Sequence, residues 1–127
     1  HVAYVFCNVK GYCKIGKYIG NGNANGTFVY TGFKPAFVMI KGTSNNRNWN
    51  IIDNKRDTFN PSGDFLQANT TNSEDTSSID MDFLSNGFKL NVSSGRVNAA
   101  ETYIYMAIAD EPLTANVGAN GIPNTAR

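Results

Sequence analysis

Histidine is almost absent from this sequence: the one histidine is His1, the first residue. Hydrolytic mechanisms of the Ser–His–Asp and Cys–His types need a histidine as general base. Zinc sites need several cysteine or histidine ligands at set spacings, and the chain has only the cysteines Cys7 and Cys13. These shortages argue against triad hydrolases and zinc proteins, and we expect no metal and no cofactor.

Charge and long apolar runs are also scarce. Charged residues make up 17% of the chain, and the formal net charge is +1. Nucleic acids and anionic membranes attract strongly basic surfaces, so we expect no nucleic-acid partner. No apolar stretch approaches the roughly 18 residues of a membrane span, and we expect no membrane insertion. The chain opens on HVAYVFCNV without a methionine. We expect it to be a processed product or, as we favour, the C-terminal part of a longer protein.

Asparagine and glycine are abundant instead, with 18 and 12 occurrences. Both are weak helix formers and common turn residues, so the composition is typical of a β-protein with many turns. The run GNGNANG, residues 20–26, lacks the Lys-Ser or Lys-Thr pair of a phosphate loop. The β-branched and aromatic segment TFVYT follows it, which indicates a strand rather than a helix. We therefore interpret GNGNANG as a turn between strands.

Short strands with turn signals between them recur along the chain. The alternation is clearest in TYIYMAIA, residues 102–109, whose lack of charge predicts a central strand covered on both faces. No window shows a sustained helical period. This pattern predicts an all-β fold, an antiparallel β-sandwich or jelly-roll-like single domain over residues 1–109, followed by an extended C-terminal tail over 110–127. The expected strands are 3–9, 12–19, 27–31, 36–42, 48–53, 64–68, 78–84, 87–92 and 102–109.

Period-2 alternation also predicts which residues share a face. We expect six apolar side chains to lie in or against the core: Phe37, Met39, Phe88, Leu90, Ile104 and Met106.

The two cysteines flank a turn at Lys10-Gly11. A two-residue turn separates the thiols onto opposite faces, whereas a three-residue loop brings them together. We favour reduced thiols, because nothing marks an oxidising compartment.

Few residues combine into a candidate site. Asp80 and Asp82 share a strand face and could form a glycosidase pair or join Glu74 and Asp75 around Ca²⁺, but a solvated strand face explains them more simply. Trp49 lies in NNRNWNIID, where an aromatic ring among amides resembles a sugar platform. Its alternative role is core packing beside Ile51. The candidate ligand-binding residues are Trp49, Asn48 and Arg47.

Several segments together resemble a known family. They are GYCKIGKYIGNGNANGTFVYTGFKPAFVMIK, NWNIIDNKRDTFNP, IDMDFLSNGFKL, TYIYMAIADEPL and the final TAR. In order and spacing they resemble a domain of unknown function found at the C-terminal end of tailed-phage structural proteins, often marine and described as tail-fibre-like. The sequence departs from that pattern at Ile108, where phenylalanine is expected, and at Cys13, where serine is common. Neither departure touches a proposed site.

The resemblance implies a virion or fibre context and no enzymatic activity. It implies a homo-oligomer, most often a trimer in phage fibres, together with other virion proteins as partners. One hypothesis is an adhesive module on the virion surface that binds host-surface carbohydrate through its loops. The alternative is a purely structural self-assembly unit without a ligand, such as a capsid decoration or filament subunit. The tail keeps apolar residues that a disordered segment usually lacks, so we expect assembly contacts at Leu113, Val117 and Ile122.

Overall fold

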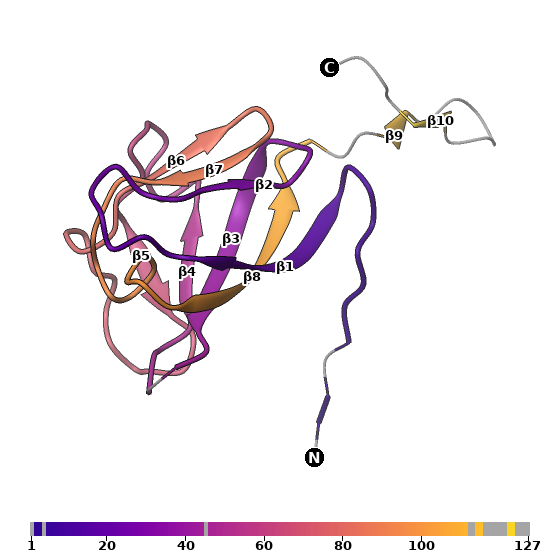
Figure 1. Ribbon diagram of the computed structural model, residues 1–127. Helices are drawn as coiled ribbons and strands as arrows, with labels where there is room; N and C mark the ends of the chain where they lie inside the picture. The colour runs from indigo at the N-terminus through magenta and orange to yellow at the C-terminus, as the bar shows by residue number, and fades with distance from the viewer. Residues whose placement is uncertain (1, 4, 45, 112–113, 116–121, 124–127) are drawn as a thin grey trace.

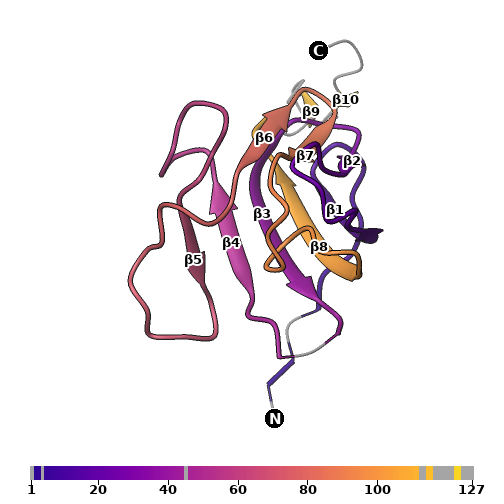
Figure 2. The ribbon, with the colours of Figure 1, turned by 60° about the vertical axis from the view of Figure 1, so that its left-hand side comes forward.

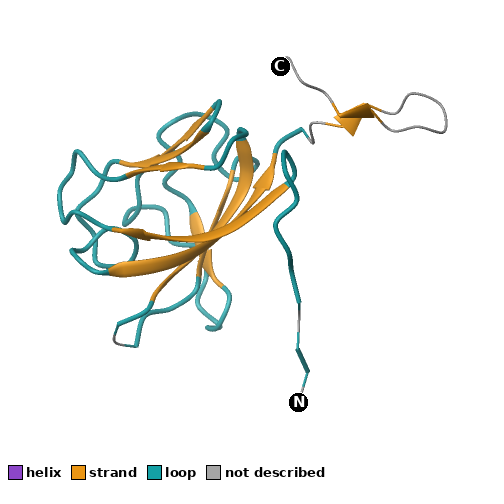
Figure 3. Ribbon diagram, turned by 45° about the vertical axis from the view of Figure 1, so that its right-hand side comes forward, coloured by secondary structure: helices purple, strands orange, loops and turns teal. Residues whose placement is uncertain are grey.

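The computed structural model describes residues 2–3, 5–44, 46–111, 114–115 and 122–123. Strands and loops account for all of these described residues, with no helix among them (Figure 3). The all-β prediction is therefore confirmed. The strands are β1 (Cys13–Ile19), β2 (Phe28–Tyr30), β3 (Pro35–Gly42), β4 (Asn50–Asp53), β5 (Phe65–Gln67), β6 (Met81–Leu84), β7 (Gly87–Leu90), β8 (Thr102–Ala109), β9 (Thr114–Ala115) and β10 (Ile122–Pro123).

Two antiparallel sheets face each other in a sandwich (Figures 1 and 2). The larger sheet has the strand order β1-β8-β3-β4-β5, and the smaller has the order β2-β7-β6. Strand β8 pairs with β1 on one edge and β3 on the other, so its predicted central position is correct. Among the described residues, strands β9 and β10 pair only with each other. The expected domain boundary falls directly after β8.

The core lies between the two sheets. From the larger sheet it takes Val38, Ile40, Tyr103 and Tyr105, and from the smaller sheet it takes residues including Phe88. Phe88 packs edge-on against Tyr18 and Tyr105, with ring centroids 6.1 Å and 5.5 Å away. Burial of these large apolar side chains stabilises the sandwich.

The predicted core was right for the smaller sheet and wrong for the larger one. Phe88 and Leu90 are fully buried. The other four, Phe37, Met39, Ile104 and Met106, lie on the outer face of the larger sheet, and Ile104 is 38% exposed. Their neighbours in sequence take the inner positions. Within the described residues, β8 is therefore covered on its inner face only.

The segment GNGNANG is a turn, as predicted, and it connects β1 in one sheet to β2 in the other. Two of its glycines are required by close backbone contacts. A Cβ at Gly20 would lie 2.1 Å from the carbonyl oxygen of Ala99, and one at Gly26 would lie 2.2 Å from that of Leu90. The buried side chain of Asn98 holds the loop by accepting from Asn21 N and donating to Asn23 O.

The expected strand at 3–9 does not form in the described residues. Val9 pairs with Cys13 across a three-residue turn at residues 10–12. This turn lies one residue further along than the three-residue loop that would pair the cysteines, so Cys13 is opposite Val9 and neither register considered from the sequence occurs. The Asn8 side chain then accepts a hydrogen bond from Ile15 N at 2.6 Å. A side-chain acceptor that takes a ladder N–H ends strand pairing there. Both cysteines are free; Cys7 is exposed and Cys13 is buried.

Candidate functional site

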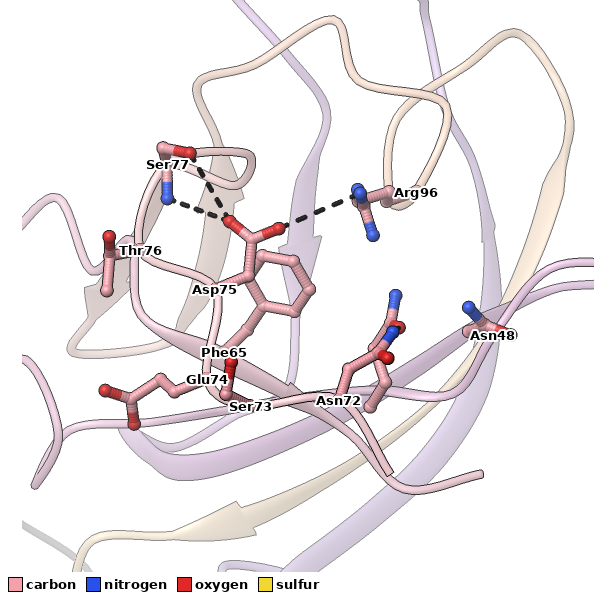
Figure 4. Close-up of a pocket in the computed structure, with 10 residues that line it drawn as sticks. Asn48, Phe65, Asn72, Ser73, Glu74, Asp75, Thr76, Ser77 and Arg96 are labelled. Atoms are coloured by element: carbon pink, nitrogen blue, oxygen red, sulfur yellow. Dashed lines mark hydrogen bonds and ion pairs between the residues drawn. The ribbon is translucent and has the colours of Figure 1, made fainter. Parts of the chain in front are cut away.

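A polar hollow of about 590 Å³ opens beside β5 on the inner side of the larger sheet (Figure 4). Three parts of the chain build it. They are β5 together with Asn48, which lies two residues before β4, the loop 72–77, and the loop that carries Arg96. Phe65 forms its apolar floor and pairs through its backbone with Asp75. The lining residues are Asn48, Phe65, Gln67, Asn72, Ser73, Glu74, Asp75, Thr76, Ser77 and Arg96.

Arg96 is the cation of the hollow. Its guanidinium carbon lies 5.3 Å from the centroid of the Phe65 ring, and Nη2 lies 3.8 Å from Asp75 Oδ2. The contact with Asp75 is an ion pair without a hydrogen bond, and within the described residues the guanidinium donates no hydrogen bond. The side chain is 40% exposed. Its donors therefore face the hollow in a position fixed by stacking on Phe65.

The acidic side chains of the hollow are already engaged. Asp75 accepts from Ser77 N at 3.1 Å and from Ser78 Oγ at 3.2 Å, and Glu74 pairs with Arg56. In the part of the chain that the structure describes, no group of three or more histidine, cysteine or acidic residues is placed to hold a metal ion. The free hydrogen-bonding capacity of the hollow therefore comes from amides, hydroxyls and one guanidinium.

The buried amide of Asn50 ties two walls of the hollow together. Its Nδ2 donates to Asn48 O and to Arg96 O, both at 3.2 Å. Asn50 is 1% exposed, and its Oδ1 has no hydrogen-bond partner among the described residues. Buried polar groups need hydrogen-bond partners, and this contact connects the Arg96 loop to the start of β4.

The three residues predicted as a ligand site do not gather at one place. Asn48 lines the polar hollow, whereas Trp49 lines a second groove on the outer face of the larger sheet. Arg47 forms an ion pair with Glu101, with Nε 3.0 Å from Oε1. Sequence reasoning missed Arg96, Gln67 and Asn72, because loops from distant parts of the chain bring them together and no local motif marks them.

The second groove lies on a continuous apolar row. In register across all five strands, Ile15 is opposite Met106, Met106 opposite Met39, Met39 opposite Ile51, and Ile51 opposite Leu66. Residues directly opposite one another in antiparallel strands share a face. All five side chains are half-buried on the solvent side. Soluble sheets usually place polar residues there, so an apolar row on the solvent side is unusual for a sheet of this kind.

Trp49 stands at the rim of this groove, which has a volume of about 780 Å³. The Trp49 backbone is fixed on both sides: its N–H donates to Asn69 Oδ1 at 2.9 Å, and its carbonyl accepts from Ala68 N at 3.0 Å. Lys41 Nζ lies 5.8 Å from the ring centroid. Trp49 is thus neither a core residue nor part of the polar hollow.

The remaining candidates are separate from both places. Asp82 accepts a hydrogen bond from Asn91 at 2.8 Å, while Asp80 is exposed. Of the predicted assembly residues, Leu113 and Val117 lie outside the described residues. Ile122 belongs to β10, whose side chains are not described. No helix in the described residues is long and apolar enough to cross a membrane.

Comparison with known proteins gives a family without an assigned function. Residues 1–112 match a family described as a domain of unknown function (DUF7483). No curated protein and no solved structure matches the chain. Since the match spans both sheets of the sandwich, the polar hollow and the apolar row, the chain belongs to the DUF7483 family.

Proposed function

We propose that this chain is a non-enzymatic structural module of a tailed-phage virion or fibre and works there as a homo-oligomer. The single observation that carries the proposal is the apolar row Ile15–Met106–Met39–Ile51–Leu66 on the outer face of the larger sheet. A sheet face of this kind is typical of subunits that bury it in an assembly. The sequence resemblance supplies the virion context.

The surroundings of the row support an interface. Lys17 and Lys41 flank Ile104 in register at one end, and Asp53 stands opposite Phe37 at the other. An apolar centre with a charged rim is the usual anatomy of a protein interface. Trp49 at the edge of the groove belongs to the residue type most often found among the energetically dominant contacts of such surfaces.

Sedimentation of the full chain tests this function. We expect a discrete oligomer that dissociates when Met106 is replaced by lysine, because a charge in the apolar row is costly to bury. Asp82→Lys on the smaller sheet serves as the matched control and should leave the oligomer intact. A full chain that sediments as a monomer up to high concentration would contradict the proposal.

Adhesion to host-surface carbohydrate is the second candidate, and the polar hollow favours it. Amides of Asn48, Gln67 and Asn72 offer both donors and acceptors, and Arg96 adds unused donors. Such mixed polar groups suit sugar hydroxyls and carboxylates. Weak sites of this kind gain strength when a homo-oligomer repeats them.

Binding of soluble host polysaccharide fragments, measured by calorimetry, tests adhesion. Arg96→Ala should weaken binding about ten-fold or more, since a charge-assisted hydrogen bond contributes about 1.5–3 kcal/mol. Lys89→Ala on the smaller sheet is the control. If Trp49→Ala removes binding while Arg96→Ala does not, the sugar site is the outer groove and the hollow is excluded.

A further inference from the structure

We infer that copies of this chain pack outer face to outer face, with residues 2–9 of one copy lying in the apolar groove of another. Residues 2–9 are called the N-terminal arm below. The inference rests on the proposed homo-oligomer and deepens it by naming the contact. It rests on two apolar surfaces that lie next to each other in the chain: the exposed side chains of the arm and the groove on the outer face of the larger sheet.

The N-terminal arm has the sequence of a strand, but its described residues before Val9 have no strand partner among the described residues. Its alternating apolar residues predict pairing, yet among the described residues only Val9 pairs, with Cys13. Asn8 Oδ1 accepts a hydrogen bond from Ile15 N. In a continued β-ladder between the arm and β1, this N–H would donate to the arm backbone instead. The arm therefore leaves the edge of β1 instead of extending the sheet, as Figures 1 and 2 show.

Once it leaves the edge, the arm buries little of its apolar surface. Val2 is 82% exposed, Val5 is 90% exposed and Phe6 is 58% exposed. Phe6 nevertheless borders the outer groove together with Ile15 and Ile104. The arm thus lies beside the apolar row, and its apolar side chains are suited to fill the groove. In its own chain they leave the groove largely open.

The area of the apolar outer face bears on whether two copies touch through these faces alone or also through the N-terminal arm. Five strands at about 4.8 Å spacing and five residues at about 3.3 Å rise give an apolar area of roughly 24 by 16 Å, about 400 Å². Each partner in a stable complex usually buries about 800 Å². That total includes a polar rim, so the apolar faces supply about half of it and the arm would extend the contact. The arm is eight residues long, about 26 Å when extended, so it spans the sheet and adds its own apolar area to the contact.

Cysteine crosslinking between two forms of the full chain tests the arm contact. Both forms carry Cys13→Ser, and the arm form keeps its natural Cys7. The groove form carries a mass tag, Cys7→Ser and Ile104→Cys. The control form carries Asp80→Cys in place of Ile104→Cys, which puts the thiol just before β6 in the opposite sheet. A short bismaleimide is added to each mixture.

We expect the arm–groove adduct to form in at least about ten-fold higher yield than the control adduct, because docking raises the local thiol concentration. Equal yields in a chain that light scattering shows to be oligomeric would overturn the arm contact and leave the proposed function standing. A monomeric chain with equal yields would overturn both. If circular dichroism shows that Ile104→Cys is unfolded, Met39→Cys in the same groove replaces it.

Discussion

The rings of Tyr18 and Tyr103 stack with centroids 5.2 Å apart and an interplanar angle of 12°, and both hydroxyls reach the loop that carries Arg96. Tyr18 Oη donates to Val97 O at 2.6 Å. Tyr103 Oη accepts from Ala99 N and donates to Gly95 O, both at 2.9 Å. The buried core of the sandwich therefore fixes the loop that bears the cation of the polar hollow.

Removing the Tyr18 hydroxyl tests this connection. Tyr18→Phe leaves the packing of the ring but deprives the Val97 carbonyl of its donor, which should lower the free energy of unfolding by about 1–3 kcal/mol. Urea denaturation measures the change. Tyr12→Phe, at a half-exposed ring outside the core, is the control and should change stability by less than about 0.5 kcal/mol. Equal stabilities of the two variants would show that the loop does not depend on this bond.

The same tyrosines predict a loss of stability at alkaline pH. Burial, followed by the nearby Tyr103, raises the pKa of Tyr18 well above its usual value, and burial raises the pKa of Tyr103 to about 12. A raised tyrosine pKa means that the folded state favours the neutral form. The resulting stability is fully present below the usual pKa near 10 and is lost as pH rises towards the folded value.

Urea denaturation from pH 8 to pH 12 measures this dependence. The unfolding free energy of the natural chain should stay level up to about pH 10 and then fall. In Tyr18→Phe the fall should be smaller, because one of the ionising groups is gone. Tyr12→Phe should show the full decline, and a Tyr18→Phe profile parallel to that of the natural chain would refute the assignment to Tyr18.

Besides the two tyrosines, the buried amide of Asn98 also holds the loops in place, because it connects segments that are far apart in the chain. It is fully buried, accepts from Asn21 N at 3.1 Å, and donates to Asn23 O at 2.9 Å and Val92 O at 2.8 Å. Asn98→Ala should lower stability by about 2–4 kcal/mol, since several buried groups lose a partner at roughly 1–3 kcal/mol each. Chemical denaturation measures it, with the exposed Asn46→Ala as control. A loss below about 1 kcal/mol would mean that water replaces the amide.

The alternation in the sequence predicted which residues share a face but not which face is inside. In β8, four alternate residues are all buried: Tyr103, Tyr105, Ala107 and Ala109. This agrees with the rule that every second residue of a strand points to the same face. The difficulty is that both faces of β8 are apolar. Hydropathy favours Ile104 over tyrosine for the interior, but the core accepts Tyr103, whose hydroxyl finds a hydrogen-bond partner there.

The candidate sites were less predictable than the strands. Trp49 and Asn48 are adjacent in sequence, and the sequence suggested a joint site. In the structure they line different surfaces, because neighbouring residues beside a strand point to opposite sides. Arg96 reaches the hollow only through the tertiary contacts of its loop. The N-terminal arm had a strand pattern, yet one side chain, Asn8, ended its pairing.

Asp53 gives a prediction at acidic pH. Burial alone would raise its pKa, but hydrogen bonds from the backbone N–H groups of Arg56 and Lys55, together with the Arg56 guanidinium, outweigh burial and lower the pKa. A lowered carboxyl pKa contributes stability that is present above the usual value near 4. That stability is lost as pH falls through the folded value.

Asp53→Asn should therefore flatten the acid side of the stability profile. At pH 7 the variant should be less stable by up to about 1 kcal/mol, because the ion pair is partly exposed and screened by solvent. The difference should shrink as pH is lowered from 5 to 2 in urea-denaturation measurements. Asp80→Asn, at an exposed carboxylate, is the control. A difference that stays constant across this range would contradict the charge-based explanation.

Two phenylalanines, one in the core and one on the outer face of the larger sheet, allow folding and the proposed assembly to be tested separately. Phe88 is fully buried in the core, and Phe37 is half-buried on the outer face beside the apolar row. Phe88→Ala should lower the unfolding free energy by about 3–5 kcal/mol at any protein concentration, because it empties a packed core position. Phe37→Ala should cost less than about 2 kcal/mol in dilute solution, since part of that ring remains in water.

Their concentration dependence should differ as well. Where folding is linked to association, stability rises with protein concentration, so thermal melts of the natural chain should shift upward as the concentration is raised. The Phe37→Ala variant should show a smaller upward shift, because the outer face then contributes less contact area between copies. A Phe88→Ala variant that still folds should keep the full upward shift from its lower starting point. If the melting temperature of the natural chain does not depend on concentration, the outer face is not an interface between copies and the apolar row requires another partner.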